Sequence, residues 1–321
     1  MPLIKSSAYR PPFYLFEGHS QTIVPGLFRN AHLLAFQRER ISTPDDDFLD
    51  LDWLTQKSKQ LIIISHGLEG NSQRPYMTGM AKAFYEQGWD ALCWNFRGCS
   101  GEMNRQLRFY HSGATDDLDT VIRHALCKGY ETVALCGFSL GGNLTLKYLG
   151  EQKENIPSQI KGAVAISVPV HLSSSGKKLS QRENIVYAKR FLKTLKEKVR
   201  NKAAIYPKDL PLDQLDRIKT LKDFDDVYTG PLHGFRDAED YYQQCSALYF
   251  LEHIKVKTLL LNALNDPFLS TACYPTAIAQ DLSNLYLEYP KHGGHVGFTP
   301  ASKASLYYSE KRAVEFLTIP S

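Results

Sequence analysis

The residues best suited to chemistry lie in one short run, GFSLG at positions 137–141. A β-prone apolar segment precedes Ser139, and a helical pattern follows it at once. This arrangement predicts a nucleophile elbow, a turn so tight that both flanking positions, 137 and 141, must be glycine. The turn would expose the Ser139 hydroxyl above a sheet edge. It would also leave the Leu140 amide free at a helix N-terminus, where it could donate to an oxyanion.

A nucleophilic serine needs a base, and the base needs an acid that orients it. Downstream of Ser139, Asp266 follows the apolar run 256–262, and His295 follows the run 285–288. Both residues therefore fall at the carboxyl ends of predicted strands, the edge where open α/β sheets place their chemistry. We expect Asp266 and His295 to complete a catalytic triad with Ser139.

Each of these two assignments has an alternative. An aspartate before a proline, here Pro267, is often only the start of a turn. His292 lies in the same loop as His295 and could in principle replace it. Two intervening glycines, 293 and 294, favour His295, because they let the loop bring the imidazole back over the serine.

A second oxyanion donor is expected in the loop after the first parallel strand, where the sequence is HGLEG at 66–70. The Leu68 and Leu140 amides are the expected pair of donors. His66 is expected to brace this loop rather than to transfer protons. Four side chains are candidates to line the substrate pocket: His66, Arg97, Phe138 and His111. Arg97 follows the strand predicted at 90–96, where it either shapes the turn or contacts substrate.

The elements that would position these residues alternate between strand and helix from residue 60 onward. Strands are expected at 61–64, 90–96, 133–136, 162–168, 256–262 and 285–288, and helices near 75–87, 115–127, 142–150, 275–281 and 303–317. Such alternation predicts an α/β fold with a mainly parallel, doubly wound sheet. Two further strands, 35–41 and 48–54, flank an acidic turn and predict an antiparallel hairpin at the sheet edge.

Residues 171–250 interrupt this rhythm, since they are helical in pattern, charged and aromatic, with no convincing core strand. We interpret them as a helical cap insertion within a single domain spanning 1–321. Within them, 177–202 carries ten lysines and arginines against two acids. Apolar residues recur there at helical spacing: Ile185, Ala188, Phe191, Leu192, Leu195 and Val199.

The basic segment has two interpretations. It could dock its apolar stripe on the body with its lysines facing water, which we favour, or it could make peripheral contact with anionic lipid. Nucleic-acid binding is not expected, because no recognition module accompanies the charge.

Composition is typical of a globular protein, with 321 residues of which 43% are hydrophobic and 22% charged. No apolar run is long enough for a membrane span, and the first residues lack the apolar core of a secretory signal. The six cysteines show no regular spacing. These features favour a reducing, cytoplasmic compartment. The chemistry above requires no metal and no organic cofactor.

Taken together, these motifs resemble the YheT-type branch of the α/β-hydrolases, which includes plant embryogenesis-associated and animal lipid-acting relatives. The resemblance rests on HGLEG at 66–70, NFRGCSG at 95–101, YHSGATDDL at 110–118, GFSLGGN at 137–143 and GGHVGF at 293–298, and extends to GHSQT at 18–22 and to 224–234. It implies the α/β-hydrolase fold and a serine hydrolase acting on carboxylic esters, including lipid esters. The resemblance also implies the triad roles for Ser139, Asp266 and His295.

Two other functions stay open. The family's H-x-x-x-x-D pattern, His111 to Asp116 here, is reminiscent of glycerolipid acyltransferases, in which the histidine deprotonates an acceptor hydroxyl. We favour a structural interpretation, in which Thr115 caps a helix whose first turn holds Asp116, Asp117 and Asp119. A non-catalytic, lipid-binding relative is the other alternative, although such relatives usually lack a triad member.

Overall fold

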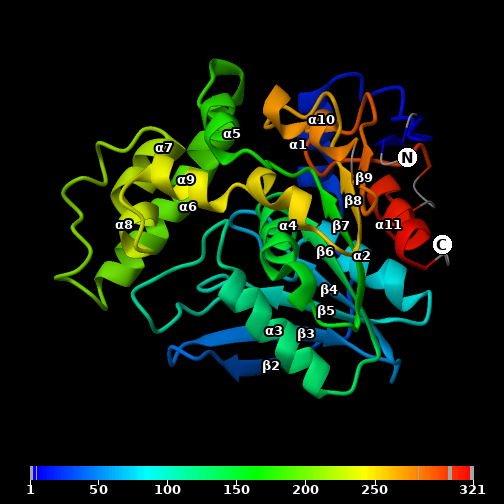
Figure 1. The fold of residues 1–321 in the computed structure, drawn as a ribbon. Coiled ribbons are helices and arrows are strands. Elements are labelled where there is room, and N and C mark those ends of the chain that lie inside the picture. The colour runs from blue at the N-terminus through cyan, green and yellow to red at the C-terminus, as the bar shows by residue number, and fades with distance from the viewer. Residues whose placement is uncertain (1–2, 5, 281, 303–305, 319–321) are drawn as a thin grey trace.

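The computed structural model describes residues 3–4, 6–280, 282–302 and 306–318. In this part of the chain nine strands form one sheet in the order β1-β9-β8-β7-β6-β4-β5-β3-β2 (Figure 1). Their bounds are β1 Leu3–Ile4, β2 Gln37–Ser42, β3 Phe48–Leu54, β4 Gln60–Ser65, β5 Asp90–Asn95, β6 Thr132–Phe138, β7 Ile160–Ile166, β8 Lys257–Leu261 and β9 Leu285–Glu288. All neighbours are parallel except β2–β3 and β3–β5.

This topology confirms the expected α/β fold and the antiparallel hairpin at one edge of the sheet. The apolar run in β4 shows why the central strands could be predicted from sequence. Leu61 and Ile63 pack into the core on one face, whereas Ile62 and Ile64 pack into the core on the other. A strand that is covered on both faces has no polar side, so it reads as a continuous β-branched run.

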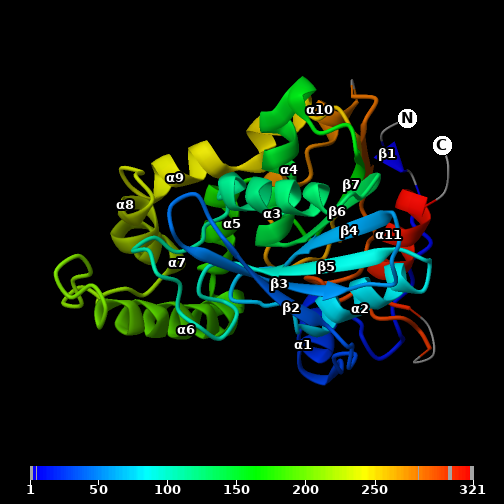
Figure 2. The ribbon, with the colours of Figure 1, turned by 90° about the horizontal axis from the view of Figure 1, so that it is seen from below.

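Two pairs of helices cover the two faces (Figures 1 and 2). The pair α2 (Pro75–Tyr85) and α11 (Tyr308–Thr318) contributes to one core, and α3 (Thr115–Cys127) and α4 (Leu140–Gln152) to the other. The helix predicted to begin near 303 starts at Tyr308, and residues 303–305 lie outside the described part of the chain. The helix predicted over 275–281 is α10 (Thr276–Ala279), and residue 281 is also outside that part.

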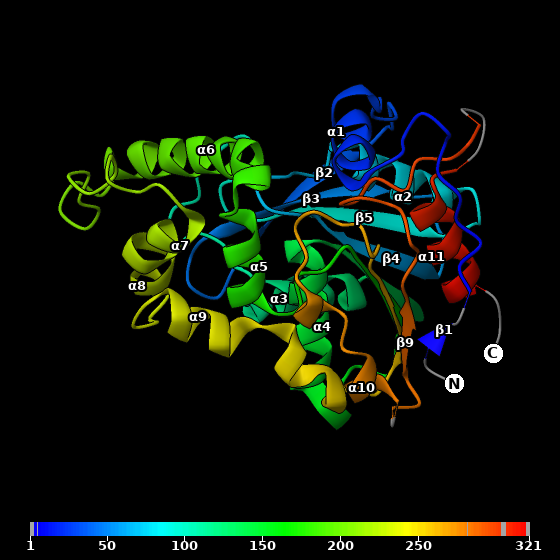
Figure 3. The same ribbon diagram turned by 90° about the horizontal axis from the view of Figure 1, so that it is seen from above.

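A layer of helices lies between β7 and β8 in the chain and to one side of the sheet (Figure 3). It comprises α5 Leu172–Leu179, α6 Ile185–Ala203, α7 Leu221–Phe224, a π-helical turn Asp225–Thr229, α8 Gly230–Leu232 and α9 Ala238–Cys245. Much of this helical layer packs around a core of its own, which includes Phe109 from the connection between β5 and α3. No helix in the described ranges is both long and apolar enough to cross a bilayer.

The structure adds one helix that the sequence pattern did not predict. Helix α1 (Gly18–Phe28) is capped by Glu17, whose carboxylate accepts from the His19 and Ser20 amides. Pro25 lies inside it. This helix proves important for the site.

Candidate active site

Ser139 occupies the turn between β6 and α4, with φ 53° and ψ −116°. Few L-residues adopt such a backbone, and it persists only where the surroundings enforce it. A methyl group on Gly137 would overlap the Gly141 carbonyl, and one on Gly141 would lie 2.5 Å from the Ser65 carbonyl oxygen. Only glycine fits at either position, so the GxSxG spacing follows from close packing around the turn.

Ser139, His295 and Asp266 form a continuous hydrogen-bonded chain. His295 Nε2 lies 2.9 Å from Ser139 Oγ, and His295 Nδ1 lies 2.8 Å from Asp266 Oδ2. The Asp266 side chain is fully buried, and its other oxygen accepts the Phe268 amide at 2.9 Å. Because a carboxylate only accepts, the Nδ1 proton points at Asp266, which leaves Nε2 free to accept the serine proton. His292 takes no part in this chain.

Helix α1 fixes the loop that carries His295. Gln21 Oε1 accepts from the Gly293 amide at 2.6 Å and from Asn265 Nδ2 at 2.9 Å. Thr22 Oγ1 accepts the His295 amide itself at 2.9 Å. The GHSQT motif therefore joins the acid loop to the histidine loop. From the sequence, this motif entered only through the family resemblance, and neither Thr22 nor Asn265 was predicted to belong to the site.

A further hydrogen bond, between two residues with strained backbones, supports the same loop. Ser167, directly after β7, accepts the Val296 amide on its hydroxyl at 2.9 Å. Ser167 and Val296 have φ values of 54° and 59°, and Val296 is β-branched, for which a positive φ is rare. The turn after His295 is thus held by contacts rather than by its own preference.

The loop after β4 lies directly against the nucleophile. A methyl group on Gly67 would come within 3.3 Å of Ser139 Cβ. Among the described residues, neither the Leu68 nor the Leu140 amide donates to another protein group. Two unpartnered N–H groups beside a serine hydroxyl are the donors that an oxyanion-binding site needs.

His66 braces this loop from within the core and does not reach the pocket. Its Nδ1 contacts the Gly67 carbonyl at 2.7 Å, its Nε2 accepts the Phe96 amide at 3.1 Å, and its ring packs on that of Phe96. Burial lowers the pKa of His66 to about 3, so the imidazole is neutral with its proton on Nδ1. The expected bracing role agrees with these contacts, and the alternative placement in the pocket is wrong.

Arg97 and Phe138 were also candidates to line the substrate pocket, but neither faces it. The Arg97 guanidinium pairs with Asp117, Asp45 and Asp47 at 2.7 to 3.0 Å and is 1% exposed. It ties the hairpin turn to α3 and has no donor left for a substrate. Phe138 is fully buried and packs on the Tyr76 ring, on the sheet face that α2 covers.

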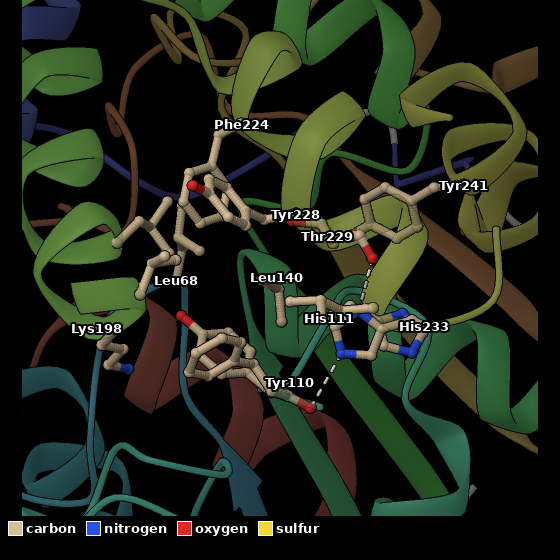
Figure 4. Close-up of a pocket in the computed structure, with 14 residues that line it drawn as sticks. Leu68, Tyr110, His111, Leu140, Lys198, Phe224, Tyr228, Thr229, His233 and Tyr241 are labelled. Carbon is tan, nitrogen blue, oxygen red and sulfur yellow. Dashed lines mark hydrogen bonds between the residues drawn. The ribbon is translucent and has the colours of Figure 1, made fainter. Parts of the chain in front are cut away.

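His111 is the one candidate of the four that lines the pocket (Figure 4). Its Nδ1 accepts the Gly113 amide at 3.2 Å, and its ring lies 4.5 Å from that of His233. Burial lowers the pKa of His111 well below its usual value. Asp116 instead pairs with Arg108 at 2.8 Å, so the proposed His111–Asp116 pair is not assembled.

The helix that follows His111 also differs from expectation. Its N-cap is Ala114, with no side-chain cap, and the Thr115 hydroxyl donates instead to Glu151 at 2.6 Å. Asp116 and Asp117 lie in the first turn as expected, whereas Asp119 lies beyond it.

The pocket lies between the loops at the edge of the sheet and the helical layer, and its lining is mostly apolar (Figure 4). Leu68 and Leu140 supply the wall next to the elbow. Facing them are residues of the helical layer, namely Leu195, Lys198, Val199, Phe224, Tyr228, Thr229, Leu232, His233 and Tyr241. The pocket therefore begins at the two residues whose amides are unpartnered.

Helix α6 contributes a largely buried cation beside the same loop. Lys198 Nζ donates to Glu69 Oε1 at 2.8 Å and lies 3.0 Å from Cys99 Sγ. Tyr110 donates its hydroxyl to Glu69 Oε1 at 2.6 Å. Lys202, one turn on, is also buried and donates to the Asn104 carbonyl. The expectation that the lysines of this segment face water is wrong for these two.

No group of three or more histidine, cysteine or acidic side chains is arranged to hold a metal ion in the described ranges. The residues around Ser139 can supply a nucleophile, a base, an orienting acid and two amide donors. This set is sufficient for acyl transfer from an ester.

Comparisons with known proteins agree with this chemistry. A family model described as the alpha/beta hydrolase fold matches residues 60–300. YheT of Escherichia coli (strain K12), an inferred esterase, is 36% identical over 287 residues, which cover 87% of this chain and 84% of YheT. Phospholipase ABHD3 of Bos taurus is 27% identical over 92% of this chain and 74% of its own length.

Solved structures show the same fold at lower identity. The Pyrococcus furiosus esterase Pf2001 superposes with a TM-score of 0.59 at 17% identity, covering 89% of this chain and 91% of that chain.

Proposed function

Because this chain belongs to the α/β-hydrolase fold family, in the branch that includes YheT, we propose that it hydrolyses carboxylic esters through an acyl-enzyme on Ser139. The observation that carries the proposal is the hydrogen-bonded chain from Ser139 Oγ through His295 to Asp266. The relatives are named as esterases and lipases, which supports ester hydrolysis as the reaction class.

In the proposed reaction, Ser139 Oγ attacks the ester carbonyl carbon while His295 Nε2 takes the hydroxyl proton. Asp266 keeps the imidazole in the required tautomer and stabilises the imidazolium that forms. The Leu68 and Leu140 amides donate to the carbonyl oxygen as it becomes negative. His295 then gives its proton to the leaving alkoxide. Water repeats the cycle on the acyl-enzyme and releases the acid.

The acyl chain is proposed to occupy the apolar pocket between the sheet domain and residues 171–250, which would act as the cap of a single hydrolase domain. The pocket begins at Leu68 and Leu140, so a carbonyl held by their amides would point its chain into it. An apolar lining favours short or medium acyl groups and lipid esters over charged acids.

The test measures the hydrolysis of p-nitrophenyl esters of increasing acyl length by the parent protein and by Ser139→Ala. We expect turnover to fall by roughly 10⁴-fold or more in the variant. Ser158→Ala, an exposed serine, is the matched control and should keep full activity. Labelling of the parent by a fluorophosphonate, lost in Ser139→Ala alone, would locate the nucleophile. Activity that survives Ser139→Ala would contradict the proposal.

Acyl transfer would share the same acyl-enzyme and differ only in the acceptor. Added alcohol should then divert product from acid to ester, which chromatography measures directly. A folded parent with no activity on any ester, but with affinity for lipid, would instead identify a lipid-binding relative.

A further inference from the structure

Large apolar side chains are exposed along the N-terminal arm and α1. Phe13 is 95% exposed, Phe16 79%, Leu27 62% and Phe28 74%, and Tyr14, Ile23 and Leu33 are exposed in the same stretch. Single exposed apolar residues are ordinary on any protein surface. A concentration of them within residues 13–33 instead indicates a surface that meets an apolar partner.

The first turn of α6 extends this surface. Val186 is 71% exposed, and its neighbour Tyr187 contacts His19 of α1 through a hydrogen bond of 3.1 Å. Figures 2 and 3 place α1 and α6 along the same side of the molecule. We define the docking surface as the exposed side chains of residues 13–33 together with those of 185–193.

The charge next to the apolar side chains is positive. Lys189, Arg190 and Lys193 are exposed and share one face of α6 with Val186, at helical spacings of three, four and seven residues. None of the three forms an ion pair with an acid in the described part of the chain. Exposed aromatic and aliphatic groups beside unpaired cations match the interface of an anionic lipid bilayer.

The reverse side of the docking surface holds the active site. Thr22 accepts the His295 amide, and Tyr187 packs edge-to-face on Phe268, whose ring lies 4.1 Å from that of His295. A bilayer bound at this surface would therefore lie two side-chain layers from the catalytic imidazole.

We propose that the docking surface binds anionic lipid bilayers and presents lipid esters to Ser139. The binding step stands alone, whereas the delivery step rests on the proposed ester hydrolysis. The sequence analysis favoured docking of the basic segment on the body and kept lipid contact by that segment as the alternative. In the structure the apolar stripe of α6 is mainly buried, so the proposed lipid contact is made by α1 together with the first turns of α6.

The test is co-sedimentation of Ser139→Ala, which cannot turn over, with vesicles. One set is phosphatidylcholine alone, and the other is phosphatidylcholine and phosphatidylglycerol in equal parts. We expect stronger binding to the anionic vesicles, weakening with added salt. Phe16→Ser with Phe28→Ser should reduce the partition coefficient at least tenfold, as should Lys189→Gln, Arg190→Gln and Lys193→Gln combined, at roughly fivefold per basic residue.

Ile205→Ser with Leu212→Ser is the matched control, since both residues are exposed outside the docking surface, in the segment after α6. It should bind like the parent. In the active background, every surface variant should hydrolyse p-nitrophenyl butyrate at the parental rate. Binding without any ester hydrolysis would reject the proposed function and keep the docking surface.

Two results would overturn the inference. One is equal vesicle binding by the parent and both surface variants. The other is no vesicle binding by the parent, and sedimentation velocity then tests whether the parent is dimeric and the Phe16→Ser, Phe28→Ser variant monomeric. If the parent is dimeric and that variant monomeric, this face is an interface between two copies of the chain.

Discussion

Ser139, Ser167, Val296 and Phe298 all have positive φ values, between 42° and 59°. Each such residue costs about 1–3 kcal/mol, and the cost is offset by the contacts that impose the conformation. Here those contacts are the glycine packing at the elbow and the hydrogen bond from Val296 to Ser167. At the scale of single residues, four of the eight non-glycine residues with positive φ in the described ranges lie where Ser139 and His295 meet.

Thr22→Val tests how far one hydroxyl positions His295, the proposed base. The substitution keeps the shape but removes the acceptor of the half-buried His295 amide, and leaving such a donor unsatisfied costs about 1–3 kcal/mol. We expect kcat for p-nitrophenyl butyrate to fall about tenfold with KM changed less than twofold, because binding groups are untouched. Thr22→Ser keeps the hydroxyl and should restore kcat. A Val variant with parental kcat would show that the loop needs no such support.

His66→Asn tests a pH effect that follows from burial. The folded-state pKa of His66 is about 3 and its ordinary value is 6.5, so the unfolded chain takes up a proton first as pH falls. The contribution of His66 to stability is complete above pH 6.5 and is lost as pH falls toward 3. Between pH 7 and pH 5 the parent should lose about 2 kcal/mol more unfolding free energy than the variant, measured by urea titration. Parallel losses in both proteins would contradict this.

At the scale of elements, the sequence predicted strands and helices whose buried residues are apolar, and it did not predict the helix whose buried residues are not. The strand β4 was predicted because its residues face two apolar cores. Helix α1 was missed because its buried residues are Gly18, Gln21 and Pro25, which form no apolar stripe. Its role depends on hydrogen bonds to loops more than 240 residues away in the chain, and no local signal encodes those partners.

The ion pair between Lys198 and Glu69 joins helix α6 to the loop that carries the Leu68 amide. Lys198→Met would leave the Glu69 carboxylate buried and unpaired, so we expect the unfolding free energy to drop by about 3–5 kcal/mol. Chemical denaturation measures this loss. In addition, kcat should fall about tenfold, because the loop that carries Leu68, a proposed oxyanion donor, loses its contact with α6.

A double variant separates stability from positioning. Lys198→Met with Glu69→Gln removes both charges, so most of the unfolding free energy should return while kcat stays reduced. Lys193→Met, an exposed lysine on the same helix, should change neither quantity. Full recovery of kcat in the double variant would mean that the ion pair is only structural.

At the scale of the whole molecule, the chain order of serine, acid and histidine predicted residues that the fold brings into contact. The pocket was not predictable in the same way, because its walls come from segments far apart, such as Phe109, Leu140 and Tyr228. Arg97 was misplaced for a related reason. Its partners, Asp45 and Asp117, come from a hairpin turn and a helix whose approach is set by the completed sheet.

In the described part of the chain, two cores lie on the faces of the sheet and two smaller ones lie in the helical layer. Because these cores are distinct, the helical layer should open without unfolding the sheet. Leu210→Ala removes a buried side chain from the helical core and should cost that layer about 2–5 kcal/mol. Hydrogen exchange should therefore accelerate in α6 and α7 and stay unchanged in β6 and β8. Equal acceleration in the strands would show that sheet and helical layer unfold as one unit, and the layer could not then admit a substrate by opening alone.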